Sequence, residues 1–473
     1  MDKFYVTTAI PYVNAPPHIG HALEFVQGDA IARYHKLLGQ EVKFLSGGDE
    51  NALKNVQAAE TAGRQVQDFV NENTSLFLKL SQKLDVEYDI FQKGSDTKKH
   101  FPSSQKLWDL CAKAGDIYSK AYKGLYCVGC ETFYEKEELN ENGECVEHPG
   151  KKLAVVEEEN YFFKLSKYEK KLIDLISSDE IKILPKTRKN EVLGFLNQGL
   201  KDISISRSNQ RAKDWGVSVP GDDNQRIYVW FDALNIYQSG IGFGWDKKSY
   251  SKWWPANVHV IGKGIIRFHS VYWPAFLLSA GLKLPKEIFA HGYITVEGQK
   301  MSKTIGNVID PFVLIKKYGI DPLRYYLLRE IPSYSDGNFS DSRFKELYNA
   351  DLANGLGNLV ARVCTLAAKA NLQSQNNKLE MYPEVKEYLN EYRFDLALEF
   401  LWNNKITSLD KLIDKRKPWE LEDDQLTKAL IDIISELKVV AYNLKPFMPT
   451  TADKILKQLS GVVSNGDILF PRL

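Results

Sequence analysis

The stretches FYVTTAI at residues 4–10, HIGHALEFVQGDAIARYHKLLG at 18–39 and EVKFL at 41–45 decide the fold class. The first and third are rich in β-branched and aromatic residues, which is typical of buried strands. The second has apolar residues at helical spacing and stops at Gly39, a residue suited to a helix C-cap. Strand, helix and strand in this order predict a parallel βαβ unit. The chain is therefore expected to be an α/β protein with a doubly wound, Rossmann-like parallel sheet.

Ligands of such sheets bind at the carboxyl ends of the strands. Two segments would lie there: the turn that contains Asn14, Pro16 and Pro17, and the segment SGGD at 46–49. We therefore expect the functional site around these two segments.

The remaining sequence changes character several times. We expect a sheet domain in two halves, 1–114 and 223–290, interrupted by an inserted domain at 115–222. The segments IYVWFDAL at 227–234 and VHVIGKGIIRFHSVYWPAFLLSAG at 258–281 are interpreted as returning strands and a helix. A linking region follows at 291–343. The segment 344–473 is amphipathic and poor in strand formers, which predicts an all-α helical bundle.

Composition excludes several classes of protein. The 473 residues are 44% hydrophobic and 26% charged, an ordinary globular mixture, and the formal net charge is +1. A nucleic-acid partner therefore cannot be inferred from bulk charge and would need a local patch. The cysteines number five, which argues against a disulfide framework and for a reducing compartment. The N-terminus shows no signal peptide and the longest apolar stretch, around 271–282, is too short for a membrane span. We expect a cytoplasmic protein.

The first motif with chemical meaning is His18-Ile19-Gly20-His21 at the start of the first expected helix. A helix N-terminus offers unpaired N–H groups and the positive end of the dipole, which favour phosphate. Two imidazoles add donors, and a glycine between them lets a flat ring approach the backbone. Taken alone, the motif is equally compatible with a helix start that carries two surface histidines.

The second motif is KMSKT at 300–304, flanked by Gly298 and Gly306. Lys300 and Lys303 in a mobile loop could close on a polyphosphate and stabilise the charge that develops on leaving pyrophosphate. The alternative is a solvated basic loop. No GxxxxGK[ST] sequence is present, which disfavours a P-loop enzyme.

The third motif combines Cys127-Val-Gly-Cys130 with Cys145-Val-Glu-His148. Two such knuckles can supply three thiolates and one imidazole to a tetrahedral Zn²⁺. Because the four protein ligands close the shell, we expect a structural zinc, one per chain, in a knuckle at about 125–152. The alternative is a set of ordinary core cysteines.

The first two motifs resemble the HIGH and KMSKS signatures of class I aminoacyl-tRNA synthetases. Their surroundings are similar to the methionine-specific members of that family: VTTAIPYVNAPPHIGHA at 6–22, YVWFDALNIY at 228–237, IGKGIIRFHSVYWPAFL at 261–277 and AHGYITVEGQKMSKTIGN at 290–307. The resemblance extends to PFMPTTADKILKQL at 446–459 and covers nearly the whole chain. It implies a catalytic domain at 1–114 and 223–290, a connective insertion with a zinc knuckle, and an anticodon-binding domain at 344–473.

The resemblance implies a methionine–tRNA ligase of translation. Methionine and ATP, with Mg²⁺, would give methionyl-adenylate and pyrophosphate, and the methionyl group would then pass to the 3′ end of tRNA(Met). Because the chain ends at Leu473 without the extra C-terminal domain of some relatives, we expect a monomer. The rival interpretations are a synthetase for leucine, isoleucine, valine or cysteine, and a non-catalytic tRNA-binding protein with the same fold.

The resemblance also implies roles for particular residues. Catalysis would rest on His18, His21, Lys300 and Lys303. ATP would be bound by His18, Gly20, His21, His291, Gly292, Lys300, Ser302 and Lys303. Methionine would be bound by Ile10, Tyr12, Asp49, Trp230, Ala233, Tyr237 and His269, with Asp49 on the ammonium and with the Ile10 N–H and the Tyr237 hydroxyl at the sulfur. The anticodon would be read by Asn358, Arg362 and Trp419.

Three positions depart from the pattern of the family. Gly264 stands where an aspartate is usual, Asn51 where a histidine is usual, and Thr304 where a second serine is usual. The role of the missing aspartate is not carried over to Gly264, and Asn51 is assigned no role. The threonine keeps the hydroxyl.

Overall fold

The computed structural model describes every residue except Met1, Glu131, Glu135, Pro149, Lys151, 303–305, 375–377 and Asp467. The chain forms two compact units. The first consists of Met1–Pro17, Gln40–Ser81 and Glu87–Ala290, and the second of His18–Gly39, Gln82–Val86 and His291–Leu473. Within the described part of the chain, no helix has both the length and the apolar character that crossing a membrane requires.

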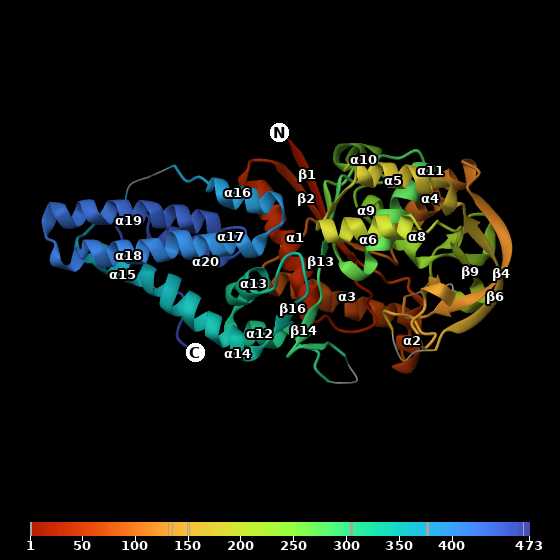
Figure 1. Ribbon diagram of the computed structural model, residues 1–473, viewed down its shortest axis with the longest axis horizontal. Coiled ribbons are helices and arrows are strands. Elements are labelled where there is room, and N and C mark those ends of the chain that lie inside the picture. The colour runs from red at the N-terminus through yellow and green to blue at the C-terminus, as the bar shows by residue number, and fades with distance from the viewer. Residues whose placement is uncertain are drawn as a thin grey trace. The chain divides into compact units, whose positions relative to one another are not determined.

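A parallel sheet forms the centre of the first unit (Figure 1). In spatial order its six strands are β3 (Ile90–Lys93), β2 (Glu41–Gly48), β1 (Lys3–Thr8), β12 (Val258–Gly262), β13 (Glu287–His291) and β7 (Lys182–Leu184). The chain builds outward from β1 to β3 on one side and from β12 to β13 on the other, so the direction of winding reverses between β1 and β12. This confirms the predicted doubly wound sheet and puts the expected ligand site beyond the ends of these two strands.

The first strands form for the reasons that the sequence suggests. Phe4 to Thr8 are buried on both faces of the sheet, as parallel strands covered on both sides must be. Val6 of β1 pairs with Phe44 of β2 and with Val258 of β12. The expected strand at 4–10 ends at Thr8, whereas the one expected at 41–45 continues to Gly48. The helix expected at 18–39 is present as α1 (Ile19–Leu37).

The segment between the two halves of the parallel sheet forms antiparallel sheets. The larger contains β5 (Thr132–Tyr134), β4 (Ile117–Cys127), β6 (Ala154–Phe163) and β8 (Ile203–Ser204); the smaller contains β10 (Ser218–Val219), β11 (Asp222–Ile227) and β9 (Ser206–Ser208). Figure 1 shows β4 and β6 as a long curved pair, registered from Ile117–Phe163 to Tyr126–Ala154. Cys127 ends β4 and Cys130 lies in the turn after it, whereas Cys145 and His148 come before β6.

One sequence-based expectation was wrong. The segment 227–234 was interpreted as a returning strand, but only Ile227 lies in a strand, at the end of β11, and Val229–Leu234 forms helix α8. All six residues of α8 are buried. A short helix that is buried on every side has no amphipathic period, so its sequence cannot be distinguished from that of a buried strand.

The other helices in this part of the chain surround the sheets. They are α2 (Leu53–Thr61), α3 (Val66–Lys83), α4 (His100–Lys113), α5 (Glu169–Ser177), α6 (Lys186–Leu196), α7 (Asn209–Ala212), α9 (Ile236–Ser239), α10 (Lys247–Trp253) and α11 (Trp273–Ser279). A 3-10 turn at Lys263–Ile265 and a π-helical turn at Phe268–Tyr272 follow β12. The π-helical turn carries His269, which the sequence analysis placed in the site.

The second unit is mainly helical and begins with α1. A small sheet contains β15 (Gln299–Lys300), β14 (Ile294–Val296) and β16 (Gly337–Phe339). Its helices are α12 (Pro311–Tyr318), α13 (Ile320–Arg329), α14 (Asp341–Leu347), α15 (Asn358–Lys369), α16 (Pro383–Asn390), α17 (Phe394–Phe400), α18 (Thr407–Arg416), α19 (Asp423–Leu444) and α20 (Pro449–Gln458), with π-helical segments at Tyr348–Gly357 and Leu401–Ile406. Helices α15, α18 and α20 all pack against α19 (Figure 1). The predicted C-terminal helical bundle is therefore present.

A buried ion pair connects distant segments inside the second unit. The guanidinium of Arg324 on α13 bonds to the Asp29 carboxylate of α1 at 2.7 Å and donates to the carbonyls of Leu84, Pro446 and Phe447. The side chains of Arg324 and Asp29 are 0% and 1% exposed. This pair holds α1, whose first turn carries the histidine motif, against α13.

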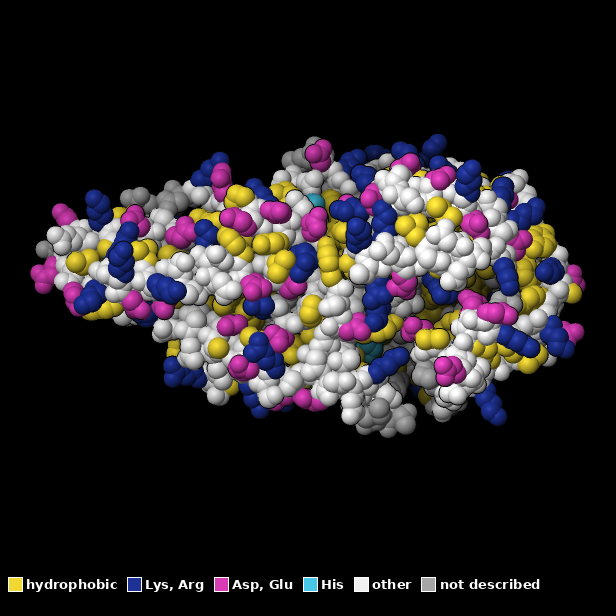
Figure 2. Space-filling view, viewed as in Figure 1, with side chains coloured by type: hydrophobic (Ala, Val, Ile, Leu, Met, Phe, Trp, Pro, Cys, Tyr) yellow, Lys and Arg dark blue, Asp and Glu magenta, His cyan; other side chains and the backbone are white. Residues whose placement is uncertain are grey.

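Among the described residues, the face of the molecule seen in Figure 2 has no large patch of side chains that all carry the same charge. Lys and Arg side chains are interspersed with Asp and Glu side chains there. This agrees with the formal net charge of +1. Any recognition of a polyanion on that face must therefore rest on a few particular side chains.

Candidate active site

The histidine motif caps helix α1. The Gly20 N–H donates to Nδ1 of His18, and the His18 N–H donates to Nδ1 of His21, both at 3.1 Å. The two rings stack with centroids 3.9 Å apart. A Cβ at Gly20 would lie 2.9 Å from Cε1 of His18, so only glycine lets this ring fold back over the helix end.

These contacts decide how the two imidazoles can act. In each neutral ring Nδ1 accepts a hydrogen bond, so the proton is on Nε2. Burial and the neighbouring His18 hold the pKa of His21 well below its ordinary value. His21 is therefore a neutral donor at neutral pH, beside the positive end of the helix dipole.

The lysine motif lies on a hairpin. Strands β14 and β15 are joined by Glu297 and Gly298, both with positive φ, as a type I′ turn requires. The side chain of Asn307 holds Lys300 and Ser302 in place. Its Oδ1 accepts from the Ser302 N–H at 2.7 Å, and its Nδ2 donates to the Lys300 carbonyl at 3.2 Å. Lys300 is exposed. Lys303 and Thr304 lie outside the described residues.

The two motifs lie side by side in the second unit. The Ile19 N–H donates to the Ile309 carbonyl at 3.1 Å, and a Cβ at Gly20 would be 3.8 Å from Cε of Met301. Met301, which follows Lys300, therefore lies beside the tip of α1.

His291 and Gly292 follow β13 in the sequence. The His291 ring is buried between the Gly292 carbonyl, 2.8 Å from Nδ1, and the Glu24 carboxylate of α1, 3.0 Å from Nε2. A Cβ on Gly292 would lie 2.2 Å from the Ser335 carbonyl, so this position admits only glycine. Both residues are thus fixed close to α1.

A small apolar cavity lies at the switch point of the parallel sheet. Its volume is about 10 Å³, room for about one water molecule. It is lined by Ala9, Ile10, Asp49, Trp230, Ala233, Leu234, Tyr237, Ile265 and His269. Six of the seven residues predicted to bind methionine are among them, and the seventh, Tyr12, contacts Trp230 edge to face. A side chain as large as that of methionine can enter only if some of these groups move.

The polar groups of this cavity are few and well defined. Nδ1 of His269 donates to the Ile265 carbonyl at 2.9 Å, which leaves Nε2 to accept from the Tyr237 hydroxyl at 2.7 Å. Burial lowers the pKa of His269 to about 4, so the ring is neutral at neutral pH. Because its proton is directed to His269, the Tyr237 hydroxyl presents only oxygen lone pairs to a ligand.

Asp49 supplies the one carboxylate of this cavity. Its backbone N–H donates to the Pro11 carbonyl at 2.9 Å, and its carbonyl accepts from Asn55 at 2.8 Å. The side chain is 4% exposed. A buried carboxylate beside an apolar hollow suits an ammonium group attached to an apolar body.

The cysteine motif forms a compact metal-binding group. The Sγ atoms of Cys127, Cys130 and Cys145 and one ring nitrogen of His148 all lie within 4.8 Å of one another. Nδ1 of His148 is 3.3 Å from Cys130 Sγ. A Cβ on Gly129 would lie 2.6 Å from the His148 ring, so the turn leaves space for that ring only because residue 129 is glycine. Three soft thiol ligands and one imidazole at these separations fit a tetrahedral metal ion.

The predicted anticodon residues lie on the helical bundle. Arg362 on α15 bonds to Asp410 and Asp414 of α18, both at 2.7 Å, and its guanidinium is 5.8 Å from the centroid of the Trp419 ring. Trp419 is 49% exposed, and Asn358, one turn before Arg362, is also exposed. The structure thus brings an exposed aromatic face and a guanidinium together.

Comparison with known proteins identifies the family. The model of "tRNA synthetases class I (M)" matches residues 4–149 and 137–364, well over half of the chain. This chain belongs to the class I tRNA synthetases. It is an aminoacyl-tRNA ligase.

Individual relatives agree with that assignment. The methionine–tRNA ligase of Thermotoga maritima is 41% identical over 97% of this chain and 75% of its own length. That of Brucella suis is 39% identical over 97% of this chain and 92% of its own. The structure of Mycobacterium tuberculosis methionyl-tRNA synthetase in complex with methionyl-adenylate matches with a TM-score of 0.91, 37% identity, and coverage of 100% of this chain and 99% of that one.

Sequence reasoning missed a polar network behind the cavity of this synthetase. Asn51, which was assigned no role, donates through Nδ2 to the Asp232 carboxylate at 2.6 Å and to the Gly94 carbonyl at 2.7 Å. Asp232, on α8, also lies 2.8 Å from Nε2 of His100 and accepts from Ser104 at 2.7 Å. The network fixes α8, which carries Trp230 and Ala233. No motif revealed it, because Asn51, the segment 94–104 and Asp232 are separated from one another by more than 40 residues.

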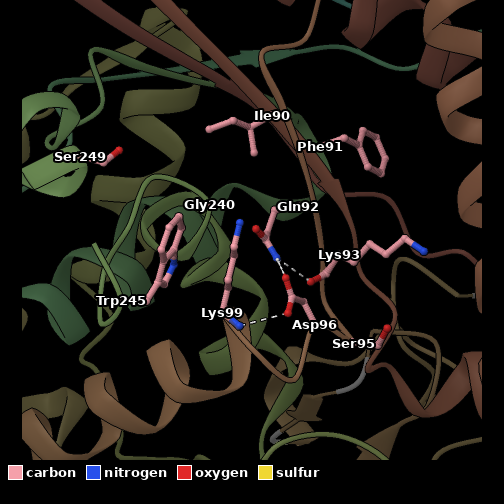
Figure 3. Close-up of a pocket in the computed structure, with 10 residues that line it drawn as sticks. All are labelled: Ile90, Phe91, Gln92, Lys93, Ser95, Asp96, Lys99, Gly240, Trp245 and Ser249. Atoms are coloured by element: carbon pink, nitrogen blue, oxygen red, sulfur yellow. Dashed lines mark hydrogen bonds between the residues drawn. The ribbon is translucent and has the colours of Figure 1, made fainter. Parts of the chain in front are cut away.

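A second, larger cavity lies elsewhere in the first unit. It has a volume of about 540 Å³ and lies beyond β3, lined by Ile90, Phe91, Gln92, Lys93, Ser95, Asp96, Lys99, Gly240, Trp245 and Ser249. Figure 3 shows the Lys99 side chain beside the Trp245 ring, with its ammonium 4.5 Å from the ring centroid. None of the predicted site residues lines it.

Proposed function

We propose that this aminoacyl-tRNA ligase is a methionine–tRNA ligase. It forms methionyl-adenylate and pyrophosphate from L-methionine and ATP, and then transfers the methionyl group to the 3′ end of tRNA(Met). The observation that carries the choice of amino acid is the cavity at the switch point, which is apolar apart from Asp49, Tyr237 and His269. Membership of the class I family and the names of the relatives support the same choice.

Methionine binding combines one charge with a long apolar surface. The Asp49 carboxylate accepts the substrate ammonium, and Ile10, Tyr12, Trp230 and Ala233 surround the side chain, whose thioether is polarisable and suits aromatic walls. His269 holds the Tyr237 hydroxyl in place. With its proton directed to His269, Tyr237 contacts the sulfur through its oxygen, so the Ile10 N–H is the donor toward the thioether.

ATP binding rests on the tip of α1 and the neighbouring hairpin. His18 and His21 present Nε2–H donors to phosphate oxygens, with Gly20 allowing close approach. Lys300 and Lys303, with Ser302 beside them, neutralise the charge that develops as pyrophosphate leaves. His291 and Gly292 line the nucleotide near Glu24. Mg²⁺ bound with ATP would supply further charge neutralisation on the phosphates.

Activation needs no side-chain base in this scheme. The methionine carboxylate attacks the α-phosphorus, the bond to the pyrophosphate bridging oxygen breaks, and the ribose hydroxyl of the tRNA end later attacks the acyl carbon and releases AMP. Positioning and electrostatic stabilisation supply the catalysis.

We assign tRNA(Met) recognition to the helical region, with Asn358, Arg362 and Trp419 as readers of the anticodon. Splayed bases stack on exposed aromatic rings and pair with amide and guanidinium donors. Asp410 and Asp414 hold Arg362 in place until a base replaces one of them.

The remaining assignments follow from the same function. We infer a structural zinc, one per chain, at Cys127, Cys130, Cys145 and His148, and a cytoplasmic monomer. We also propose a division into catalytic segments 1–114 and 223–290, a connective insertion 115–222, a linking region 291–343 and an anticodon-binding domain 344–473.

Amino-acid-dependent exchange of pyrophosphate into ATP tests the function directly. Methionine should support exchange at least about a hundredfold better than leucine, isoleucine, valine or cysteine, because only a long, unbranched thioether side chain both fills the apolar walls and brings a sulfur to the Ile10 N–H. Exchange with another amino acid as the best substrate would replace methionine in the proposal. Absence of exchange with any of them would favour a non-catalytic tRNA-binding protein.

A further inference from the structure

Two aromatic rings, one that lines the cavity and one that packs on it, are connected to the backbone of the cysteine knuckle. The indole N–H of Trp230 donates to the Cys130 carbonyl at 3.1 Å. The Lys54 ammonium, on α2, donates to the Gly129 carbonyl at 3.0 Å and lies 3.1 Å from the centroid of the Tyr12 ring. Two successive carbonyls of one turn therefore hold Trp230, which lines the pocket, and, through Lys54, Tyr12, which packs on Trp230.

These contacts restrict the positions of both rings. Trp230 stacks on Phe268 with centroids 3.7 Å apart and an interplanar angle of 4°. Tyr12 meets Trp230 edge to face at 6.2 Å. A shift of the Gly129–Cys130 carbonyls would thus move one ring directly and the other through the lysine ammonium.

The position of those carbonyls depends on the knuckle. Cys127 and Cys130, on either side of Val128 and Gly129, belong to the metal-binding group. The His148 ring occupies the space in which a side chain at 129 would lie. A bound metal ion would fix Cys130 and His148 relative to one another, and with them the direction of the Gly129 and Cys130 carbonyls.

We propose that Lys54 is a positioning residue for methionine, which couples the metal-bound state of the knuckle to the shape of the methionine pocket. Its ammonium holds the Tyr12 ring through a cation–π contact while the Gly129 carbonyl holds the ammonium. The inference rests on the proposed function, because it names methionine as the ligand of the pocket.

The first test compares Lys54→Met with Lys54→Arg and with Lys123→Met. The Lys54→Met side chain keeps the length of the lysine stem but has no charge, whereas Lys54→Arg keeps a cation. Lys123, the control position, lies on the exposed part of β4 and pairs with Glu157 of β6. Lys54→Met should raise the KM for methionine about tenfold, the loss expected for a hydrogen bond to a charged group, with kcat and the KM for ATP changed less than about twofold. Lys54→Arg should restore most of the affinity and Lys123→Met should match wild type.

The second test measures methionine binding by titration calorimetry, without ATP or turnover, before and after zinc is removed with a chelator. Wild type should lose about tenfold in affinity when the metal is removed. Lys54→Met should lose much less on metal removal, because the connection is already broken, and its zinc content should remain one per chain. This non-additivity is the signature of coupling through Lys54.

The outcomes separate the coupling from the proposed function. If Lys54→Met binds methionine as wild type does, or if metal removal weakens both proteins by the same factor, the coupling is wrong although methionine exchange persists. If Lys54→Met lowers kcat and thermal stability together, Lys54 is merely structural and the inference is overturned. If wild type itself neither binds methionine nor exchanges pyrophosphate, the proposed function fails.

Discussion

The protonation states of single histidines determine what the candidate sites can do. His21 is held neutral by burial and by His18, and burial lowers the pKa of His269 to about 4. A neutral His269 can accept from Tyr237, whereas a protonated ring could not. The same burial makes the pocket sensitive to acid.

Replacing His269 should make stability less dependent on pH. The ordinary pKa of histidine is about 6.5, so between pH 6.5 and 4 the unfolded chain binds a proton at this position that the folded chain does not. The stability gained from a neutral His269 is therefore full above pH 6.5 and lost as pH falls toward 4. His269→Gln should lose about 2 kcal/mol less than wild type between pH 7 and pH 5 in urea unfolding. Equal losses in the two proteins would contradict a low pKa for His269.

Arg362 gives a second prediction at the residue scale. Arg362→Gln should lower kcat/KM for tRNA charging about tenfold or more, because a guanidinium contact to a base is lost, while pyrophosphate exchange stays unchanged. Arg416→Gln is the matched control, since Arg416 forms a comparable ion pair with Asp432. A drop in exchange as well as charging, or equal effects of the two substitutions, would argue against an anticodon role.

At the scale of elements, the hairpin β14–β15 and the segment after it form a unit whose geometry depends on side chains. The type I′ turn sets the direction in which Lys300 leaves the strand, and Asn307 closes the segment that follows. Lys300 and Ser302 are thus held in place by the side chain of Asn307.

Asn307→Ala should therefore slow activation without weakening methionine binding. Loss of both hydrogen bonds leaves the lysine-bearing segment less ordered, so kcat for exchange should fall about tenfold while calorimetric affinity for methionine is unchanged. Asn307→Asp keeps the acceptor for the Ser302 N–H and loses only the donor, so its defect should be intermediate. If the aspartate variant is as impaired as the alanine variant, the Ser302 contact does not hold the loop.

At the scale of the whole molecule, stability depends on contacts between distant parts of the chain. Arg324 reaches α1, the segment near Leu84 and the carbonyls at 446–447 from a position with no exposure. Buried charges are costly unless they are paired and fully hydrogen-bonded. This network therefore makes the folding of the second unit depend on four separate stretches of sequence.

Arg324→Met should destabilise the protein strongly. Removing Arg324 leaves the buried Asp29 carboxylate without its main partner, which should lower the free energy of unfolding by about 3–5 kcal/mol. Arg33 offsets a part of this loss because it also contacts Asp29. Adding Asp29→Asn should recover some of the loss. Thermal unfolding should show a clear drop for Arg324→Met and little change for Arg343→Met, whose ion pairs with Glu330 and Glu346 are solvent-exposed. Equal drops would argue against the importance of the buried network.

Local patterns in the sequence were enough to predict the elements that have a characteristic residue pattern. They also predicted the site whose metal ligands have a characteristic spacing. β1, α1 and β2 were predictable because runs of β-branched and aromatic residues, helical spacing and caps act within a few residues. The cysteine knuckle was predictable because metal ligands need short fixed separations. The histidine and lysine motifs were recognisable as residue strings, although their adjacency was visible only in the structure.

Only the tertiary structure decided the rest. Helix α8 has no amphipathic period because it is buried on every side, and the bonds from Asn51 to Asp232, Lys54 to Gly129 and Arg324 to Asp29 join residues far apart in the chain. Such contacts depend on which strands are neighbours and where the winding reverses, and no short window of sequence contains that information. The sequence by itself thus determined the fold class, the family and the motif residues, whereas the connection between the knuckle and the pocket arises from packing alone.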